Sequence, residues 1–414
     1  MVTSATIPSL TFLIDDIFLE DIRALPWQRS IEDWKELGVR LVSVRKGMGR
    51  HPIVFVQVAR QTYVIKELPG DESLREISNY RVLLERGIHT LVPIGSVLRE
   101  EGSFAVETRT GHELQPHTVG HTVTLLLDRV IPDSELYRRA FTFENRKRIW
   151  DAVIDLFVDL HSRGVYWGDA SLANTLVKFL RVDVPYIGKK VELKAFLADA
   201  ETVEIYDSLS DSLRAADVEY FIDSMEWINE DLKSEGILKD PLATLEDIEY
   251  IRNTYQLKFE ANQKLLQFEK RTGLNVQRLL GRLRIPVEVE LLKKHIEEHK
   301  WYVSEQKGKE INIREAAAHW HDSVFVPICE LFQREGVPRF FPGKTAAELY
   351  VEIMTHKYFL GVECGEDVGM AAATRDYVDR FGSINPLAAF WNTFSRKLTR
   401  ILELAETGFT GMSK

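Results

Sequence analysis

The sequence of 414 residues contains only two cysteines, Cys329 and Cys364. Two cysteines give no disulfide framework, so the sequence fits a reducing compartment. The chain also has no stretch of roughly 18 uninterrupted apolar residues, the length that a membrane span needs. Its first eighteen residues lack a basic region before their apolar run and have acids straight after it, which makes a poor signal peptide. We therefore expect a cytoplasmic protein without a membrane span.

An excess of positive charge is missing as well. The chain has 63 acidic and 53 basic residues and a net charge of −10. This balance argues against bulk binding to nucleic acid or anionic lipid and leaves room for a local basic cleft. Hydrophobic residues make up 45% and charged residues 28%, as in soluble globular proteins. A chain of this length exceeds one ordinary core, so we expect two or three cooperating units.

Strand-like and helix-like patterns occupy different parts of the chain. Short β-branched runs separated by turn residues fill the region from about 38 to 130, and one helical pattern, at 71–88, interrupts them. Helical patterns dominate after Pro132, although 175–200 has the pattern of a hairpin. The sequence thus predicts an α+β fold with a small antiparallel β lobe, a mainly helical lobe and an all-α C-terminal domain. The expected boundaries are 1–37 for an N-terminal extension, 38–130 for the first lobe, 131–285 for the second and 286–414 for the helical domain.

Two segments of the C-terminal region align with each other without gaps, 299–322 and 356–379. Both begin with His-Lys-aromatic-aromatic, have a glycine nine residues after the histidine, and carry a later aromatic residue two positions before an aspartate. The repetition predicts a duplicated helix-loop-helix unit, packed as a pseudo-symmetric pair. We expect its paired aromatic residues to be core anchors rather than ligand contacts. They are Trp301, Tyr302, Tyr358 and Phe359. His299 and His356 are expected to be helix-end or core histidines, because no second metal-ligand spacing accompanies them.

Four polar residues follow one another in the order that phosphoryl transfer from ATP requires. That reaction needs a cation for the phosphates, two oxygen ligands for Mg²⁺, and a carboxylate that orients the attacking hydroxyl. Lys66 ends the strand-like run YVIK, Asp169 and Asn174 lie in a loop after the helical pattern of 145–165, and Asp199 closes the run KAFLAD. The spacing of Asp169 and Asn174 alone is ambiguous, because both residue types also cap turns.

Further acidic residues accompany this set. Glu76 lies ten residues after Lys66 in the next helical pattern, where it would pair with Lys66 and aim its ammonium group. Glu72, one turn earlier on the same helix face, is the alternative partner. Glu201 lies two residues after Asp199 and faces the same side by strand alternation.

The motifs around these residues carry a family resemblance. LHSRGVYWGDASLAN, residues 160–174, resembles the catalytic loop of aminoglycoside and choline phosphotransferases and of lipopolysaccharide kinases. LADAE, residues 197–201, resembles the Asp-x-Glu motif of the same families. Over roughly 38–235 the chain therefore resembles the protein-kinase-like fold in its atypical bacterial and small-molecule branch. The whole chain resembles an uncharacterised bacterial family labelled as lipopolysaccharide-kinase-like, which has a helical C-terminal extension.

The resemblance implies a role for each residue of the set. Asp169 would be the catalytic carboxylate near the substrate hydroxyl, and Asn174 and Asp199 would be the magnesium ligands. Lys66 would contact the α- and β-phosphates of ATP, with Glu76 as its helix partner.

The resemblance also suggests where the rest of the nucleotide lies. Asp128, Arg129 and Val130 fall where a hinge between lobes would meet adenine through backbone groups. Gly47 and Gly49 stand in the place of a phosphate-covering loop, although an ordinary tight turn explains them as well and the third glycine is missing.

Trp167 departs from the family pattern, because the related families have a histidine two positions before the catalytic aspartate. We expect Trp167 to pack beside the loop and Glu201 to be an accessory residue of the site.

No Ala-Pro-Glu segment follows Asp199, which favours a small-molecule, sugar or lipid-linked acceptor over a protein. The resulting hypothesis is an ATP- and Mg²⁺-dependent phosphotransferase that acts on a hydroxyl group. Two alternatives stay open: a nucleotide-binding pseudokinase or scaffold whose helical tail recruits a partner, and an atypical protein Ser/Thr kinase. A homodimer or a protein partner bound through the C-terminal helices is a further expectation, and no nucleic-acid partner is expected.

Overall fold

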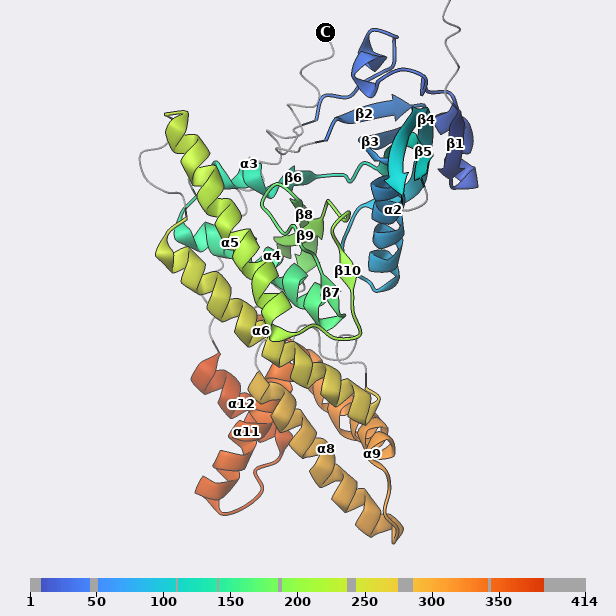
Figure 1. Cartoon of the computed structure of the whole chain (residues 1–414). Coiled ribbons are helices and arrows are strands. Elements are labelled where there is room, and N and C mark those ends of the chain that lie inside the picture. The colour runs from blue at the N-terminus through green and yellow to red at the C-terminus, as the bar shows by residue number, and fades with distance from the viewer. Residues whose placement is uncertain are drawn as a thin grey trace, which may run out of the picture. The chain divides into compact units, whose positions relative to one another are not determined.

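A computed structural model describes residues 9–44, 51–108, 111–139, 141–184, 188–236, 243–274, 286–341 and 344–382 (Figure 1). The chain forms two compact units. Within the described residues, the first contains 9–180 and 193–255, and the second contains 181–192 and 256–382. Among the described helices, none is both long and apolar enough to cross a membrane.

The first unit begins with a five-stranded antiparallel sheet in the order β1-β4-β5-β3-β2. Helix α2 packs against β4 and β5 (Figure 1). The bounds are β1 (Leu10–Ile14), β2 (Ile53–Val58), β3 (Gln61–Pro69), α2 (Gly70–Glu85), β4 (Val92–Thr108) and β5 (Gly111–Leu125). The sheet and the helices that follow it confirm the predicted α+β class.

The core of this sheet also includes residues that precede the expected lobe. Trp27 and Trp34 are buried and pack edge to face, with ring centroids 5.0 Å apart. The indole nitrogen of Trp27 donates to the carbonyl oxygen of Ile22. The segment that supplies them contains η1 (Asp16–Phe18), α1 (Leu19–Arg23) and η2 (Ile31–Lys35). Residues 10–34 thus contribute both the edge strand β1 and core side chains.

The remainder of the first unit is mainly helical. Its strands lie between the helices in chain order and form two small sheets, one with the strand order β6-β8-β9 and one with the order β10-β7. Helix α4 buries Ile149, Val153, Phe157 and Leu160, the positions given by the helical period. The bounds are β6 (Val130–Pro132), α3 (Asp133–Tyr137), α4 (Phe143–Ser162), β7 (Val165–Tyr166), β8 (Thr175–Val184), β9 (Gly188–Leu197), β10 (Glu204–Ile205), α5 (Asp211–Ser234) and α6 (Leu245–Thr272). Residues 181–192 of β8 and β9 and residues 256–272 of α6 belong to the second unit. Strands β8 and β9 form the hairpin that the sequence predicts.

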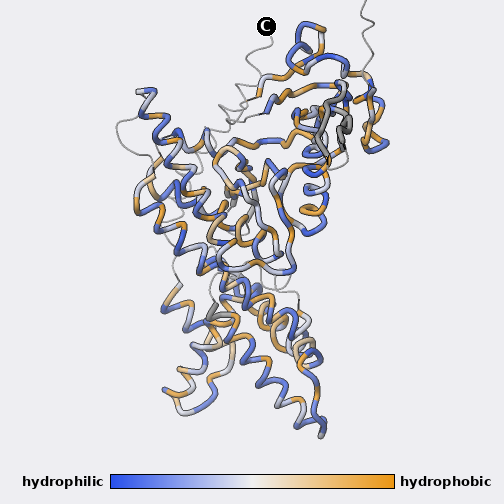
Figure 2. The backbone as a smooth tube through the Cα atoms, in the orientation of Figure 1, coloured by the Kyte–Doolittle hydropathy of each residue, from blue (hydrophilic) through white to orange (hydrophobic). Residues whose placement is uncertain are grey.

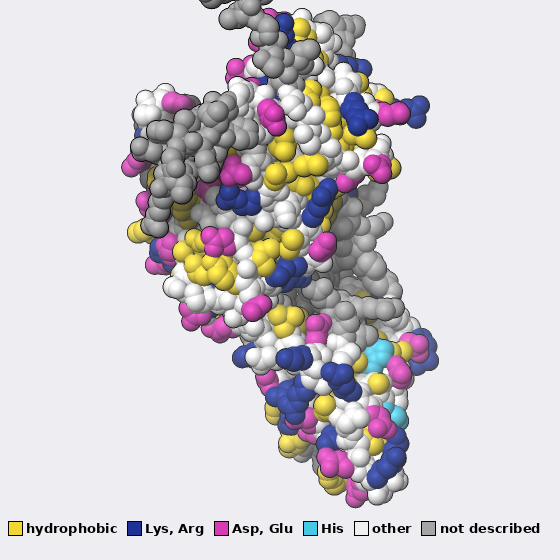
Figure 3. All heavy atoms as spheres, turned by 45° about the vertical axis from the view of Figure 1, so that its right-hand side comes forward, with side chains coloured by type: hydrophobic (Ala, Val, Ile, Leu, Met, Phe, Trp, Pro, Cys, Tyr) yellow, Lys and Arg dark blue, Asp and Glu magenta, His cyan; other side chains and the backbone are white. Residues whose placement is uncertain are grey.

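The second unit consists of helices around an aromatic core with Trp320, Phe325, Tyr350 and Tyr377. Hydrophobic and hydrophilic residues alternate along these helices (Figure 2). On the face in Figure 3, basic side chains lie among acidic ones. The bounds are α8 (Pro286–Lys307), α9 (Ile313–Trp320), the π-helical turn η3 (His321–Phe325), α10 (Val326–Arg334), η4 (Val337–Phe340), α11 (Ala346–Cys364) and α12 (Met370–Phe381).

The two aligned segments form equivalent contacts within this unit. In the first, Lys300 pairs with Glu310 at 2.6 Å and His299 Nε2 lies 2.8 Å from His319 Nδ1. In the second, contacts join the equivalent positions. Lys357 pairs with Asp367 at 2.5 Å, and His356 with Asp376 at 2.6 Å. Each half is therefore a helix, a loop and a second helix tied by side chains at the same positions.

Two expectations for these segments are wrong. The aromatic pairs are exposed rather than core anchors: Trp301 68%, Tyr302 52%, Tyr358 68% and Phe359 58%. The buried positions are Val303 and Leu360 instead, and a residue two positions away lies about 200° around a helix. His299 and His356 are half-buried in mid-helix, neither at a helix end nor in the core.

Candidate active site

Lys66 lies in β3 and is 9% exposed, with its ammonium group among three carboxylates. Its Nζ lies 3.2 Å from Glu76 Oε1, 2.8 Å from Asp199 Oδ2 and 3.1 Å from Glu201 Oε2. The four residues come from a strand, a helix and the segment after β9. The structure thus brings together residues that are 10, 133 and 135 positions from Lys66.

Burial and charge oppose each other at this cluster. Burial lowers the pKa of Lys66, but the carboxylates of Glu76 and Asp199 outweigh it and hold that pKa above its ordinary value. Burial raises the pKa of Glu76 to about 7, although the Lys66 ammonium lowers it. Lys66 is consequently a charged group at neutral pH.

The structure decides between the two candidate partners on α2. Glu76 is fully buried and contacts Lys66, whereas Glu72, in the first turn of α2, is half-buried and forms no ion pair among the described residues. A residue four positions away points along the same face but lies just over one turn, about 6 Å, further along the helix. Only Glu76 is therefore level with the ammonium group.

Helix α2 is fixed to the segment after β9 by two neighbouring polar residues. The Tyr80 hydroxyl lies 2.7 Å from the carbonyl oxygen of Ala198 and 3.0 Å from Glu76 Oε1. Asn79 Nδ2 donates to the carbonyl oxygens of Ala200 at 2.7 Å and Val203 at 3.1 Å. These bonds hold Glu76 and Asp199 on the same side of Lys66.

Asp169 and Asn174 form one hydrogen-bonded loop. Asn174 Nδ2 donates to both the carbonyl oxygen and Oδ2 of Asp169, each at 3.0 Å. The carbonyl oxygen of Asn174 accepts from the amide of Ala198 at 2.9 Å. The loop is thereby connected to the residue that precedes Asp199.

Asp217 in α5 holds the loop, and the sequence reasoning missed it. Its Oδ2 accepts from the amide of Trp167 at 2.7 Å, and its Oδ1 from the amide of Gly168 at 2.8 Å. Its Oδ2 also lies 3.1 Å from His161 Nε2. All three partners are 49 to 56 positions earlier in the chain. The sequence signal that was available is an aspartate in a helical pattern, one turn before the apolar Phe221.

The tautomer of His161 follows from these contacts. A carboxylate only accepts, so His161 Nε2 carries the hydrogen that faces Asp217. Burial lowers the pKa of His161, so the neutral ring leaves Nδ1 to accept from the Tyr255 hydroxyl at 2.6 Å. Arg214 in turn donates to the Tyr255 oxygen at 3.1 Å.

Trp167 is fully buried and makes a specific bond. Its Nε1 donates to the carbonyl oxygen of Asp199 at 3.0 Å, and its own carbonyl oxygen accepts from Thr202 Oγ1 at 2.8 Å. Trp167 therefore joins the Asp169 loop to the Asp199 segment.

Two glycines shape the loop. Gly164 has φ of +72°, and a Cβ there would lie 2.1 Å from the carbonyl oxygen of Tyr206. Gly168 has φ of +82°, with the carbonyl oxygen of Thr202 3.1 Å from such a Cβ. Both positions favour glycine for its left-handed backbone.

The remaining predicted residues are those expected to contact the rest of the nucleotide. Asp128 and Arg129 are exposed in the turn between β5 and β6, and Val130 begins β6 opposite Lys178. Gly47 and Gly49 lie outside the described residues. The segments on either side of them are paired, with an antiparallel bridge between Leu41 and Val56 and a hydrogen bond from the amide of Val42 to the carbonyl oxygen of Phe55.

Four features occur together here. They are a sheet with a packed helix, a lysine–glutamate ion pair between the two, an Asp–Asn loop after a helix, and an aspartate after a strand. This combination is typical of the fold of protein kinases. The fold is protein-kinase-like. The lysine–glutamate ion pair joins Lys66 in β3 to Glu76 in α2.

The solved structures that resemble parts of this chain include the following three. The structure of WaaP in complex with an acyl carrier protein is 17% identical, covers 61% of this chain and 98% of its own, and has a TM-score of 0.33. Two structures of the Rio2 kinase from Chaetomium thermophilum are similar. The complex with ADP/Mg²⁺-phosphoaspartate is 16% identical, covers 55% of this chain and 66% of its own, and has a TM-score of 0.30. The other structure is 15% identical, covers 57% of this chain and 76% of its own, and has a TM-score of 0.31. TM-scores in this range transfer no function.

Residues 316–381, from α9 to α12, match the model of a domain of unknown function (DUF4032). No curated protein matches the chain.

Proposed function

We propose that this chain is an ATP- and Mg²⁺-dependent phosphotransferase that moves a γ-phosphoryl group to a hydroxyl acceptor. The observation that supports it best is the position of Lys66, whose ammonium group is buried between Glu76 and Asp199. A cation held this way has a fixed position and keeps its charge, which is what phosphate binding requires.

The oxygen groups of the site suit Mg²⁺. Asn174 uses its Nδ2 to donate to Asp169, which directs its carbonyl Oδ1 away from that residue. Asn174 Oδ1 and the carboxylate of Asp199 would hold the ion, since Mg²⁺ prefers oxygen ligands. When bound, Mg²⁺ supplies positive charge that offsets the charge of the phosphates.

Asp169 would receive the proton of the acceptor hydroxyl. The bond that forms joins the acceptor oxygen to the γ-phosphorus, and the bond that breaks joins that phosphorus to the β–γ bridging oxygen, which leaves with ADP. The amide of Asn174 orients the carboxylate of Asp169 from one side. The two bonds from the amides of Trp167 and Gly168 to Asp217 hold the backbone directly before it.

The segment after Asp199 supports a small hydroxyl acceptor, such as a sugar or a lipid-linked sugar. Strand β10 follows within a few residues and pairs with β7, with Glu204 opposite Tyr166, and α5 then begins at Asp211. A short segment held in this way offers little extended backbone for docking a peptide.

A second candidate is a nucleotide-binding scaffold whose helical unit recruits a partner. The observation that favours it is the pair of exposed aromatic sites in the second unit, Trp301–Tyr302 and Tyr358–Phe359. Exposed aromatic residues at equivalent positions are more typical of binding surfaces than of catalysis.

Incubation of the full chain with radiolabelled ATP, Mg²⁺ and a panel of sugar, lipid-linked and protein acceptors tests the proposal. We expect labelled product with the wild type and at least 100-fold less with Asp169→Asn or Asp199→Asn. The exposed α2 variant Glu85→Gln is the matched control and should keep its activity. Equal product from wild type and Asp169→Asn would contradict the proposal. A thermal shift with ATP but no product from any acceptor would favour the scaffold.

A further inference from the structure

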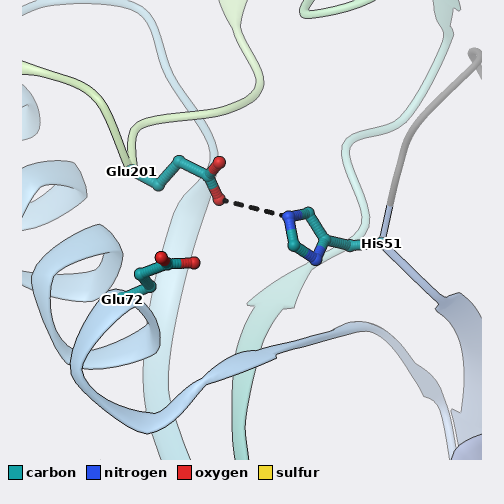
Figure 4. A group of neighbouring side chains, drawn as sticks. All are labelled: His51, Glu72 and Glu201. Atoms are coloured by element: carbon teal, nitrogen blue, oxygen red, sulfur yellow. Dashed lines mark ion pairs between the residues drawn. The ribbon is translucent and has the colours of Figure 1, made fainter.

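Three side chains from three separate segments converge beside Lys66. His51 precedes β2, Glu72 lies in the first turn of α2, and Glu201 follows β9. Figure 4 shows the three side chains directed toward one another. One ligand atom from each lies within 4.8 Å of the others, and His51 Nε2 is 3.9 Å from Glu201 Oε2.

The charge around this cluster is out of balance. This cluster and the neighbouring Lys66 site together hold four carboxylates, those of Glu72, Glu76, Asp199 and Glu201, and one ammonium group, that of Lys66. Lys66 contacts three of them, and Glu72 forms no ion pair among the residues that the structure describes. Neighbouring carboxylates without a cation repel each other, so a cation near Glu72 and Glu201 would be stabilised.

We propose that His51, Glu72 and Glu201 bind a divalent transition-metal ion, Zn²⁺ or Mn²⁺, at a site separate from Asn174. The donor set decides the class of ion. Mg²⁺ prefers oxygen ligands and keeps most of its waters, whereas an imidazole nitrogen with two carboxylates suits Zn²⁺ or Mn²⁺. Among the described residues, this is the group of three such ligands that lies close enough to share an ion.

The three ligand atoms lie within 4.8 Å of one another and would have to move closer together to share an ion. Zn²⁺ bonds to nitrogen and carboxylate oxygen are about 2.0–2.2 Å long, so tetrahedral ligand atoms are about 3.4 Å apart. The His51–Glu201 distance of 3.9 Å is within reach of a rotamer adjustment, and the side chains of His51 and Glu201 are 30% and 21% exposed. Partial exposure gives the ion a route in and leaves a coordination position for water.

Binding would change the surroundings of Lys66. Glu201 Oε2 is 3.1 Å from Lys66 Nζ, and an ion at this site would compete for that carboxylate. Lys66 would keep Glu76 and Asp199 as partners. The ion would also join three segments, the start of β2, the first turn of α2 and the segment after Asp199.

Isothermal titration of the metal-stripped full chain with Zn²⁺, Mn²⁺ and Mg²⁺, without nucleotide, tests the site. We expect one Zn²⁺ or Mn²⁺ site that His51→Gln and Glu72→Gln each weaken at least 10-fold, and Mg²⁺ binding at least 10-fold weaker than Mn²⁺. Manganese electron paramagnetic resonance gives a second reading of bound ion. The matched controls, His117→Gln and Glu85→Gln, replace exposed residues of the same types and should bind as the wild type does.

Three outcomes would overturn the proposal: no tight site in the wild type, equal affinity in His51→Gln and Glu72→Gln, or a loss with Asn174→Ala as large as that with His51→Gln. The last outcome would place the ion at Asn174 instead. Because no nucleotide or acceptor is present, the result is independent of whether the chain transfers phosphate.

Discussion

Replacing Asp217 with asparagine should loosen the loop that carries Asp169 without removing any residue of the proposed chemistry. Asp217 accepts three hydrogen bonds, from the amides of Trp167 and Gly168 and from the ring of His161. Asparagine has the same shape but only one acceptor oxygen. If that oxygen takes the place of Oδ2, the amide group of the new side chain faces the amide of Gly168, donor against donor.

The size of the effect follows from these contacts. Hydrogen bonds to a charged group contribute about 1.5–3 kcal/mol each, and an unsatisfied buried donor costs about 1–3 kcal/mol. One bond is lost and the other two become neutral bonds, which are weaker. We therefore expect Asp217→Asn to lower the free energy of unfolding by about 3 kcal/mol.

Two measurements check this expectation. Urea unfolding, followed by tryptophan fluorescence, gives the change in the free energy of unfolding. Hydrogen exchange of the peptide around residues 165–170 reports the loop itself, where an opening free energy lower by about 3 kcal/mol gives exchange on the order of 100-fold faster.

The matched control is Asp231→Asn, which changes an exposed aspartate on the same helix and should shift stability by less than about 0.5 kcal/mol. An Asp217→Asn protein with unchanged loop exchange and an unchanged urea midpoint would refute the assignment of Asp217 as the residue that holds the loop.

Two further predictions concern the same unit. Gly164→Ala should cost at least about 3 kcal/mol of stability, because its Cβ would lie 2.1 Å from the carbonyl oxygen of Tyr206. Gly87→Ala, with φ of +71° and nothing within 4 Å, should cost only about 1 kcal/mol; similar urea midpoints would contradict the clash. Burial raises the pKa of Asp133 to about 8, and its carboxylate oxygens have no hydrogen-bond partner among the described residues. An acid with a raised folded pKa loses stability as pH rises toward that value, so the wild type should lose up to about 1.4 kcal/mol per pH unit relative to Asp133→Asn between pH 5 and 7. Parallel urea curves for the two proteins at pH 5, 6 and 7 would contradict this.

The sequence indicated the α+β class and the chemical set, because both depend on local patterns. Strand alternation predicts which residues of β3 share a side, and the loop of Asp169 has a recognisable spacing. The choice between Glu72 and Glu76 stayed open, because the two share a helix face. It depends on how far along its axis α2 is docked. Asn79 and Tyr80 set that position through carbonyl groups over a hundred residues away, and no local pattern records them.

The exposed aromatic residues of the second unit show another limit. A helix with apolar residues on two faces does not tell which face is buried. The face of α8 that carries Val303 is the buried one, so Trp301 faces solvent. The same applies to Tyr358 and Phe359, which flank the buried Leu360. The alignment of the two segments correctly indicated which positions make equivalent side-chain contacts. Which face of each helix is buried depends on how the whole unit packs, and the alignment does not record this.

Trp167 connects two segments of the site through a donor that does not titrate. The indole Nε1 reaches from the loop before Asp169 to the backbone carbonyl of Asp199 and donates to it at 3.0 Å. An indole also fills more volume than an imidazole, and Trp167 is fully buried and lies beside the ring of Phe157 in α4, with centroids 6.1 Å apart. Indole nitrogen has no acceptor form, so this donor is fixed at every pH where the protein folds. The connection between the loop and the Asp199 segment through Trp167 is therefore independent of pH.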